Sequence, residues 1–264
     1  MTTVGLTATR ALPLWRPLVT GTSIVLAGAL LVAAVLGPPV LLIVDAVVMA
    51  CLVFGWVVML GLPGFQGTTL VLAVGAAASL VGGSVFARDG LLWLSASVAL
   101  VTLLAFVHQL ARRDGRPRLV ESISASVTGI VLLSSGASLL PLLSVPGGPA
   151  SAVTVMAAVC AGGLGDLGGR WDWPLKVCAL ASVLLGAAAG ATAASIMPDH
   201  GLGPVLAALV GGLAGGASHA VRQVQAVLPQ IGSRRAQLAS AAASVLSVGL
   251  FTHVATVLAS LVSW

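Results

Sequence analysis

The sequence predicts an all-α fold, a polytopic integral membrane bundle of about nine transmembrane helices, and two observations support this. The first is composition, because 58% of the 264 residues are hydrophobic, 7% are charged and the mean hydropathy is +1.12. A charged side chain at the centre of a bilayer costs roughly 2.5–3.5 kcal/mol, so a chain with so few charges suits lipid. The second is placement, because eleven of the twelve Lys and Arg residues fall in alternate connections between apolar stretches.

Nine apolar stretches follow one another along the chain, each close to the roughly 20 residues that a spanning helix needs. They cover residues 18–36, 40–60, 69–87, 90–110, 120–143, 150–168, 175–197, 203–221 and 237–262. Glycine and proline punctuate the connections, as in Gly37-Pro38-Pro39. The first stretch is too long for the apolar core of a signal peptide. We therefore expect a single transmembrane domain over residues 1–264, with a short cytoplasmic segment at 1–16.

The positive charges predict the orientation of this bundle. With the N-terminus inside, the outer connections hold only Arg88, beside Asp89. The inner segments hold all the others: Arg10, Arg16, Arg112, Arg113, Arg116, Arg118, Arg170, Lys176, Arg222, Arg234 and Arg235. The positive-inside rule then predicts a cytoplasmic N-terminus and an external C-terminus. Arginine in place of lysine and the absence of tyrosine are typical of a GC-rich bacterial genome, which indicates a multi-pass protein of a bacterial cytoplasmic (inner) membrane.

Small residues recur at helical spacing in the seventh and eighth stretches. Gly186 and Gly190 stand four residues apart, and so do Gly211 and Gly215. Such faces let helix backbones approach closely in lipid. We expect tight packing within the bundle, with homodimerisation or ligand access between helices as alternatives.

Two ionisable residues fall inside predicted spans. Asp45 lies early in the second stretch and His253 lies in the last. An ionisable group at membrane depth indicates an ion or proton pathway. The alternatives are a wet position near the outer interface for Asp45 and a structural hydrogen bond for His253. His219 falls near a cytoplasmic helix end, where interfacial contacts are expected to explain it.

The most polar segment runs from Arg112 to Arg118. Paired guanidinium groups of Arg112, Arg113, Arg116 and Arg118 are suited to binding a lipid or nucleotide phosphate. The alternative is a loop that fixes topology and faces anionic headgroups.

A second candidate site edge is the glycine-rich segment 162–170. It lacks the Gly-Lys-Ser/Thr ending of a phosphate-binding loop, so it indicates a broken helix end at the cytoplasmic surface. Asp166, Arg170 and Asp172 lie close together there and are candidate contacts for lipid or phosphate. The three cysteines share no metal-like spacing, and no metal or cofactor is expected. No basic cluster is interleaved with aromatic residues, so no nucleic-acid partner is expected.

In the last third of the chain, a few residues match a known pattern. Pro229, Gly232 and Ser240 fit a Pro-Gly-His-Gly-Gly run and the Asp-Ser after it, and Gly169-Arg170 fits an upstream Gly-Arg. With its nine spans, the chain resembles the CDP-diacylglycerol synthase (phosphatidate cytidylyltransferase) family in layout. The family's acidic positions are here occupied by Gly162, Ala217, Ala236 and Ala239.

These missing acids determine the functional prediction. Cytidylyl transfer requires cations to neutralise the developing charge, and the cations need carboxylates. We therefore expect a non-catalytic relative that binds membrane lipids, a membrane-protein partner or a second copy of itself. The alternative is a small permease or lipid translocator that uses Asp45 or His253. An active CTP-dependent enzyme of phospholipid synthesis that uses Asp166 and Asp172 is the least favoured reading.

The purified protein is accordingly expected to form no CDP-diacylglycerol from CTP in the presence of magnesium, because the metal-binding carboxylates are missing from the matched positions. A product assay measures this directly. Robust turnover would contradict the prediction.

Overall fold

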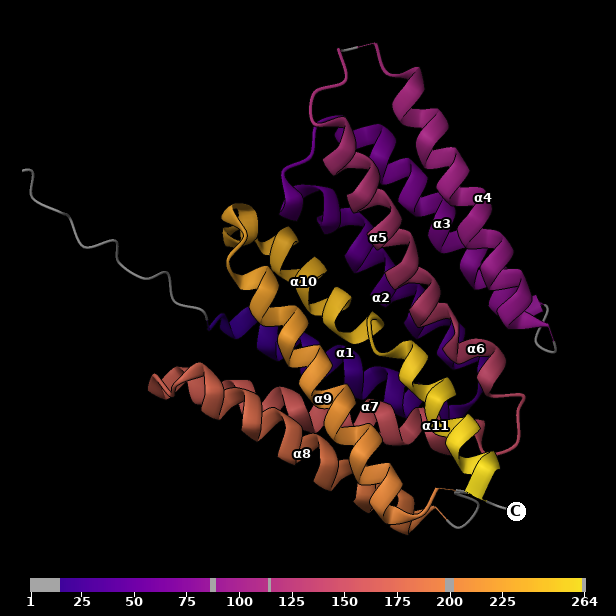
Figure 1. Ribbon diagram of the computed structural model, residues 1–264, viewed down its shortest axis with the longest axis vertical. Coiled ribbons are helices and arrows are strands. Elements are labelled where there is room, and N and C mark those ends of the chain that lie inside the picture. Colours follow the sequence, from indigo (N-terminus) through magenta and orange to yellow (C-terminus); the bar gives the residue numbers. More distant parts are fainter. Residues whose placement is uncertain (1–14, 86–88, 114, 198–201, 263–264) are drawn as a thin grey trace, which may run out of the picture.

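A computed structural model of the chain describes residues 15–85, 89–113, 115–197 and 202–262. Within these ranges the chain is helical, without strands, and nine helical segments are long and apolar enough to cross a membrane (Figure 1). The predicted multi-pass helical membrane fold is confirmed. Two residues used in the sequence argument, Arg10 and Arg88, lie outside the described ranges.

The spans are built from eleven α-helices and two short 3₁₀ helices in the described ranges. They are α1 (Pro17–Leu36), α2 (Pro38–Leu60), α3 (Phe65–Val85), α4 (Gly90–Ala111), α5 (Leu119–Ala137), α6 (Leu139–Leu142), α7 (Gly148–Gly165), η1 (Asp166–Trp171), α8 (Leu175–Ile196), α9 (Pro204–Ala226), η2 (Pro229–Gly232), α10 (Arg234–Leu246) and α11 (Gly249–Val262).

Proline and glycine set several helix ends. Pro17, Pro38 and Pro204 each occupy the first position of a helix, where the missing N–H costs nothing. Gly61 ends α2 with φ 59°, a left-handed conformation that glycine adopts without strain. These local signals explain why the predicted spans agree with the observed helices to within a few residues at most ends.

Two spans predicted as continuous helices, 120–143 and 237–262, are interrupted. The first divides into α5 and α6 after Ala137. Pro141 lies four residues later, and a proline ring clashes with the carbonyl four residues before it. The second divides into α10 and α11. There the Ser247 hydroxyl donates to the Ser244 carbonyl at 3.0 Å, which competes with helical bonding.

The interrupted last span, α10 and α11, lies between two groups of helices and contacts both. α2, α3, α4 and α5 pack together as one group, and α1, α7, α8 and α9 pack as another (Figure 1). α10 contacts α2, α1, α9 and α5, and α11 contacts α7, α5, α6 and α9. Both halves of the last span therefore touch helices of both groups.

The glycine faces predicted to allow close packing do so between α8 and α9. A Cβ atom placed on Gly186 would lie 2.6 Å from the Gly211 carbonyl oxygen. One placed on Gly215 would lie 2.7 Å from the Ser182 carbonyl oxygen. Both distances are far too short for a real side chain, so the expectation of tight packing within the bundle is confirmed.

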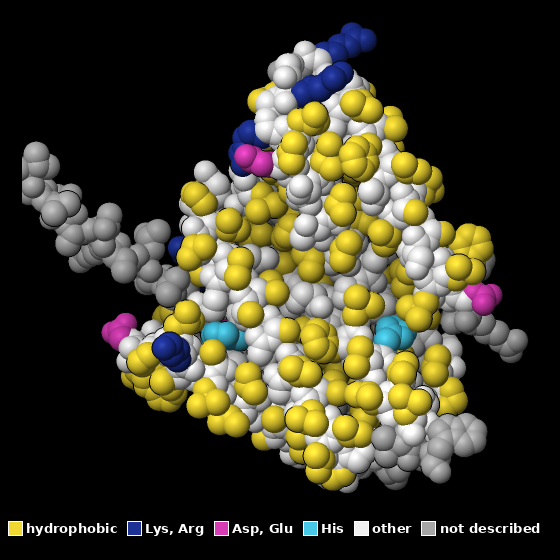
Figure 2. Space-filling view, viewed as in Figure 1, with side chains coloured by type: hydrophobic (Ala, Val, Ile, Leu, Met, Phe, Trp, Pro, Cys, Tyr) yellow, Lys and Arg dark blue, Asp and Glu magenta, His cyan; other side chains and the backbone are white. Residues whose placement is uncertain are grey.

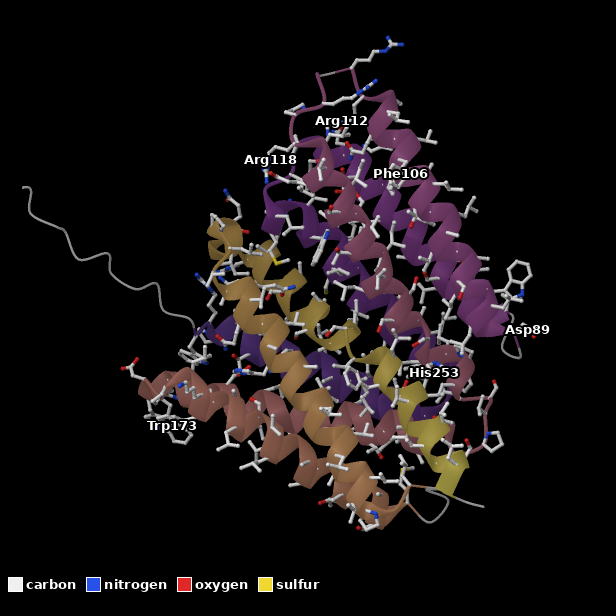
Figure 3. All side chains as sticks on the ribbon, viewed as in Figure 1. Asp89, Phe106, Arg112, Arg118, Trp173 and His253 are labelled. Carbon is white, nitrogen blue, oxygen red and sulfur yellow. The ribbon has the colours of Figure 1, made fainter. Side chains whose placement is uncertain are left out.

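The described Lys and Arg side chains are spread along one side of the molecule, from the top to the lower left of Figure 2. This side carries the 112–118 loop, η1 and the starts of α1, α8 and α10, and we call it the charged end. Asp89, at the start of α4, lies at the opposite end from Arg112 and Arg118 (Figure 3). The positive-inside rule predicts that the charged end is cytoplasmic.

Gly211→Ala is expected to destabilise the protein by about 1–3 kcal/mol, because the added methyl group overlaps the Gly186 carbonyl oxygen, 2.5 Å away. Gly21→Ala is the matched control, since nothing lies within 4 Å of a Cβ at this helical glycine. Thermal unfolding of both variants in detergent measures the difference. Equal midpoints would contradict the close packing of α8 on α9.

Candidate functional site

The candidate site is built around Asp166, where α7 gives way to η1. Its side chain is only 3% exposed, although it carries a carboxylate. Oδ2 accepts a hydrogen bond from Arg222 Nε at 2.5 Å, and Oδ1 is bonded to Nδ1 of His219. A buried carboxylate needs such partners, because an isolated charge in a low-dielectric interior is very costly.

α9 supplies both partners from one of its faces. His219 and Arg222 are three residues apart, a spacing that places two side chains on the same side of a helix. Their side chains are 5% and 3% exposed. The expectation that His219 is an interfacial residue is therefore wrong. Arg222, counted in the sequence as a charge that fixes topology, also lies inside the bundle. Pairing with Asp166 compensates for their burial.

Arg222 makes two further bonds, one within α9 and one to α10. Nη1 donates to the Ser218 hydroxyl at 2.6 Å and to the Ser244 hydroxyl at 3.4 Å. Nη2 is buried and has no hydrogen-bond partner among the described residues. The guanidinium group is thus held firmly on two of its nitrogens, and its third nitrogen remains available.

A narrow cavity of about 20 Å³, which we call the inner cavity, lies beside this guanidinium group. It is enough for about one water molecule or one ligand oxygen atom. It is lined by Trp15, Arg16, Val19, Thr20, Asp166, Arg222, Gln223, Ala226, Ile231 and Ser240.

Five buried polar atoms without a hydrogen-bond partner in the described part of the chain belong to residues that line the inner cavity. They are Trp15 Nε1, Arg16 Nε, Arg222 Nη2, Gln223 Oε1 and Ser240 Oγ. Buried polar atoms are almost always hydrogen-bonded, and leaving one unsatisfied costs about 1–3 kcal/mol. Three of the five are N–H donors and a fourth is a hydroxyl group, so the cavity is suited to an oxygen acceptor.

A larger outer cavity of about 340 Å³ adjoins the inner one and shares Trp15, Asp166 and Gln223 with it. Arg170 and Asp172 also line the outer cavity, so the structure brings together the three residues that the sequence grouped at this site. The rest of its lining is Gly169, Trp173, Leu175 and Cys178.

The other phosphate candidate, the 112–118 loop, does not contribute to either cavity. Its guanidinium groups bond within the protein instead: Arg112 Nη1 to Gln109 Oε1 at 2.8 Å and Arg116 Nη2 to the Leu110 carbonyl at 2.7 Å. Arg118 pairs with Glu121 and donates to the Gly61 carbonyl at 2.7 Å. Arg113 is exposed. These bonds fasten the loop to the ends of α2, α4 and α5.

Asp45 and His253 lie outside the site as well. Asp45 is fully buried in α2 rather than wet, and His253 is bonded through Nε2 to the Ser138 carbonyl at 2.8 Å. The structural hydrogen bond considered for His253 is confirmed.

Sequence reasoning did not identify Trp15, Arg16, His219, Arg222, Gln223 or Ser240 as parts of one site. One signal in the sequence pointed toward this site. His219 and Arg222 are three residues apart, a helical spacing, and they directly follow the glycine-rich face of α9, from which only close packing is expected.

Asp166→Asn is expected to destabilise the protein by about 3–5 kcal/mol, because it leaves the buried charge of Arg222 without its counter-charge. Asp172→Asn is the matched control. Asp172 is exposed and has φ 54°, a conformation that asparagine tolerates, so a change within about 0.5 kcal/mol is expected. Equal unfolding midpoints for the two variants would contradict the buried ion pair.

In comparisons with known proteins, no family model, curated protein or solved structure matches the chain. The described residues contain no group of three or more His, Cys, Asp or Glu side chains that is arranged to hold a metal ion. What the site offers chemically is a set of unpaired donors around a small cavity, next to a larger one.

Proposed function

We propose that the protein binds the phosphate group of a membrane lipid at its charged end, with a phosphate oxygen in the inner cavity, and that it does so without catalysis. One observation carries this proposal: the unpartnered donors of Trp15, Arg16, Arg222 and Ser240 belong to the lining of the same cavity. Charge-assisted hydrogen bonds from guanidinium groups are among the strongest that an oxyanion receives.

The charge balance around the cavity favours an anion over a neutral ligand. Arg222 is compensated by Asp166, whereas Arg16 has no acidic partner within the described ranges. The guanidinium group of Arg16 therefore contributes an uncompensated positive charge at the start of α1. A bound phosphate supplies both the missing counter-charge and acceptors for the unpaired N–H groups.

A lipid is favoured over a free anion because the outer cavity opens beside apolar surface. Leu175 lines it and is 46% exposed, and Trp173 is 49% exposed. Tryptophan at a helix end is typical of the membrane interface. Further along α8, Leu180 and Leu184 are also exposed. Acyl chains of a lipid whose headgroup occupies the cavities have an apolar face to follow there.

The resemblance to the CDP-diacylglycerol synthase family supports lipid binding but not catalysis. Arg170 and Ser240, two of its matched positions, line the two cavities. Ala236 and Ala239, at acidic positions of the family pattern, are fully buried. A Cβ atom on Gly55 would lie 2.8 Å from the Cβ of Ala239, so the packing there has no room for a carboxylate. We propose that the cavities face the cytoplasmic side of a bacterial inner membrane, an orientation that the distribution of Lys and Arg favours.

Arg16→Gln is expected to weaken binding of dioleoyl phosphatidic acid to the detergent-solubilised protein by about tenfold or more, the effect of losing one charge-assisted hydrogen bond. Arg113→Gln is the matched control, because it removes the same charge from an exposed position at the same end. Its affinity should stay within about twofold of the unmodified protein, since a surface charge contributes little. Equilibrium binding of a labelled lipid gives both values.

The same assay separates the alternatives. Dioleoylglycerol, which lacks the phosphate, should not compete, and inorganic phosphate should compete only weakly. Strong competition by inorganic phosphate would indicate that the ligand is a soluble anion rather than a lipid. A larger loss of affinity in Arg113→Gln than in Arg16→Gln would indicate that the phosphate binds at the 112–118 loop.

A further inference from the structure

A second buried carboxylate, that of Asp45 in α2, lies outside the anion site. Asp45 is 0% exposed, and neither Oδ1 nor Oδ2 has a hydrogen-bond partner among the described residues. Oδ1 lies against Gly136 of α5, 3.1 Å from the place that a Cβ atom would take there. A carboxyl group in this position gains nothing from its surroundings unless something further binds to it.

The two interrupted spans meet at this point. Gly136 is the last residue but one of α5, and the side chain of Leu246, the last residue of α10, also lies against it. The first turn of α11 is fixed to the same place, because the backbone N–H of Leu250 donates to the Ser135 hydroxyl at 3.2 Å. Asp45 therefore lies where α5 and α10 both end.

The electrostatics of this crossing favour a cation. The last four carbonyls of a helix have no partner within the helix, and the helix end carries about half a negative charge. At these two ends the hydroxyl groups of Ser138 and Ser247 already donate to the carbonyls of Ser135 and Ser244, so such a carbonyl has its second lone pair to offer a cation. Two such ends meet beside a carboxylate. Buried charges require compensation, and none comes from a basic side chain nearby.

Among the described residues of the neighbouring elements, the charged side chains lie far from the crossing. The other titratable side chains are a cysteine and a hydrogen-bonded histidine. Arg234 and Arg235 begin α10, and Glu121 lies in the first turn of α5, so all three are at the other ends of their helices. α1, α3, α6 and η2, which also pack on α2, contain no Lys, Arg, His, Asp, Glu or Cys. Cys51 lies on α2 itself, and His253 on α11 is bonded to the Ser138 carbonyl.

We propose that this crossing is a binding site for a small monovalent metal cation such as Na⁺, with the Asp45 carboxylate and backbone carbonyls at the ends of α5 and α10 as ligands. Asp45 supplies the one formal negative charge at the crossing, which a monovalent ion balances, and the partial charges of the two helix ends add to the attraction. Carboxylate and carbonyl oxygens are hard ligands that suit alkali cations rather than transition metals. In some transport proteins, interrupted membrane helices hold such ions through backbone carbonyls at the interruption.

The test is the thermal stability of the full-length protein in lipid nanodiscs as sodium chloride replaces choline chloride at constant ionic strength and pH. Sodium should raise the unfolding midpoint of the unmodified protein saturably. At a concentration one hundred times the dissociation constant, the ratio of folded to unfolded protein rises about 100-fold. Asp45→Asn should abolish the response. Asp89→Asn, the same change at an exposed position, should retain it.

Three outcomes would overturn the proposal: no difference between sodium and choline in the unmodified protein, a sodium response that persists in Asp45→Asn, or a midpoint that responds to pH alone. If Asp45→Asn does not fold, Asp45→Glu keeps the carboxylate on a longer side chain. It is expected to change the order in which Li⁺, Na⁺ and K⁺ stabilise the protein. An unchanged order would equally count against the site.

Discussion

The ion pair between Asp166 and Arg222 is the interaction on which the charged end of the bundle depends. A carboxylate that is almost fully buried needs its counter-charge, and this requirement fixes the end of α7 against α9. Because Arg222 also bonds to Ser244, the same guanidinium group sets the position of α10. Its remaining nitrogen is left beside the inner cavity. The proposed phosphate site thus follows from a structural constraint, since the pair positions a donor that it does not use.

Most of the fold was predictable from the sequence, because the cost of charge in lipid acts on every span alike. The interruptions of two spans were not, since apolar residues continue through both. Pro141 was a visible signal, but its effect at Ala137 depends on whether neighbouring helices can satisfy the freed carbonyls. The break at Ser247 depends on the approach of Gly249 to Ser135, which lies more than one hundred residues away.

The candidate site was predicted in part. Asp166, Arg170 and Asp172 are close in sequence, so their grouping in the outer cavity could be anticipated. His219 and Arg222 were assigned to the interface because a sequence shows how far a residue lies from a helix end. It does not show whether the side chain is buried. Their partner lies 53 and 56 residues away, a pairing that only the packing of α7 against α9 creates. Trp15 and Arg16 joined the site for a similar reason, since α1 packs on α7.

The measurement that tests this account most directly is a double-mutant cycle on the ion pair, with Asp166→Asn, Arg222→Gln and the combined variant unfolded under identical conditions. A buried, mutually compensating pair predicts that the second substitution costs much less once the first is present, with a coupling energy of at least about 1 kcal/mol. If the losses of unfolding free energy in the two single variants add to within about 0.5 kcal/mol in the combined variant, the two side chains do not interact. That result would also contradict the geometry proposed for the phosphate site.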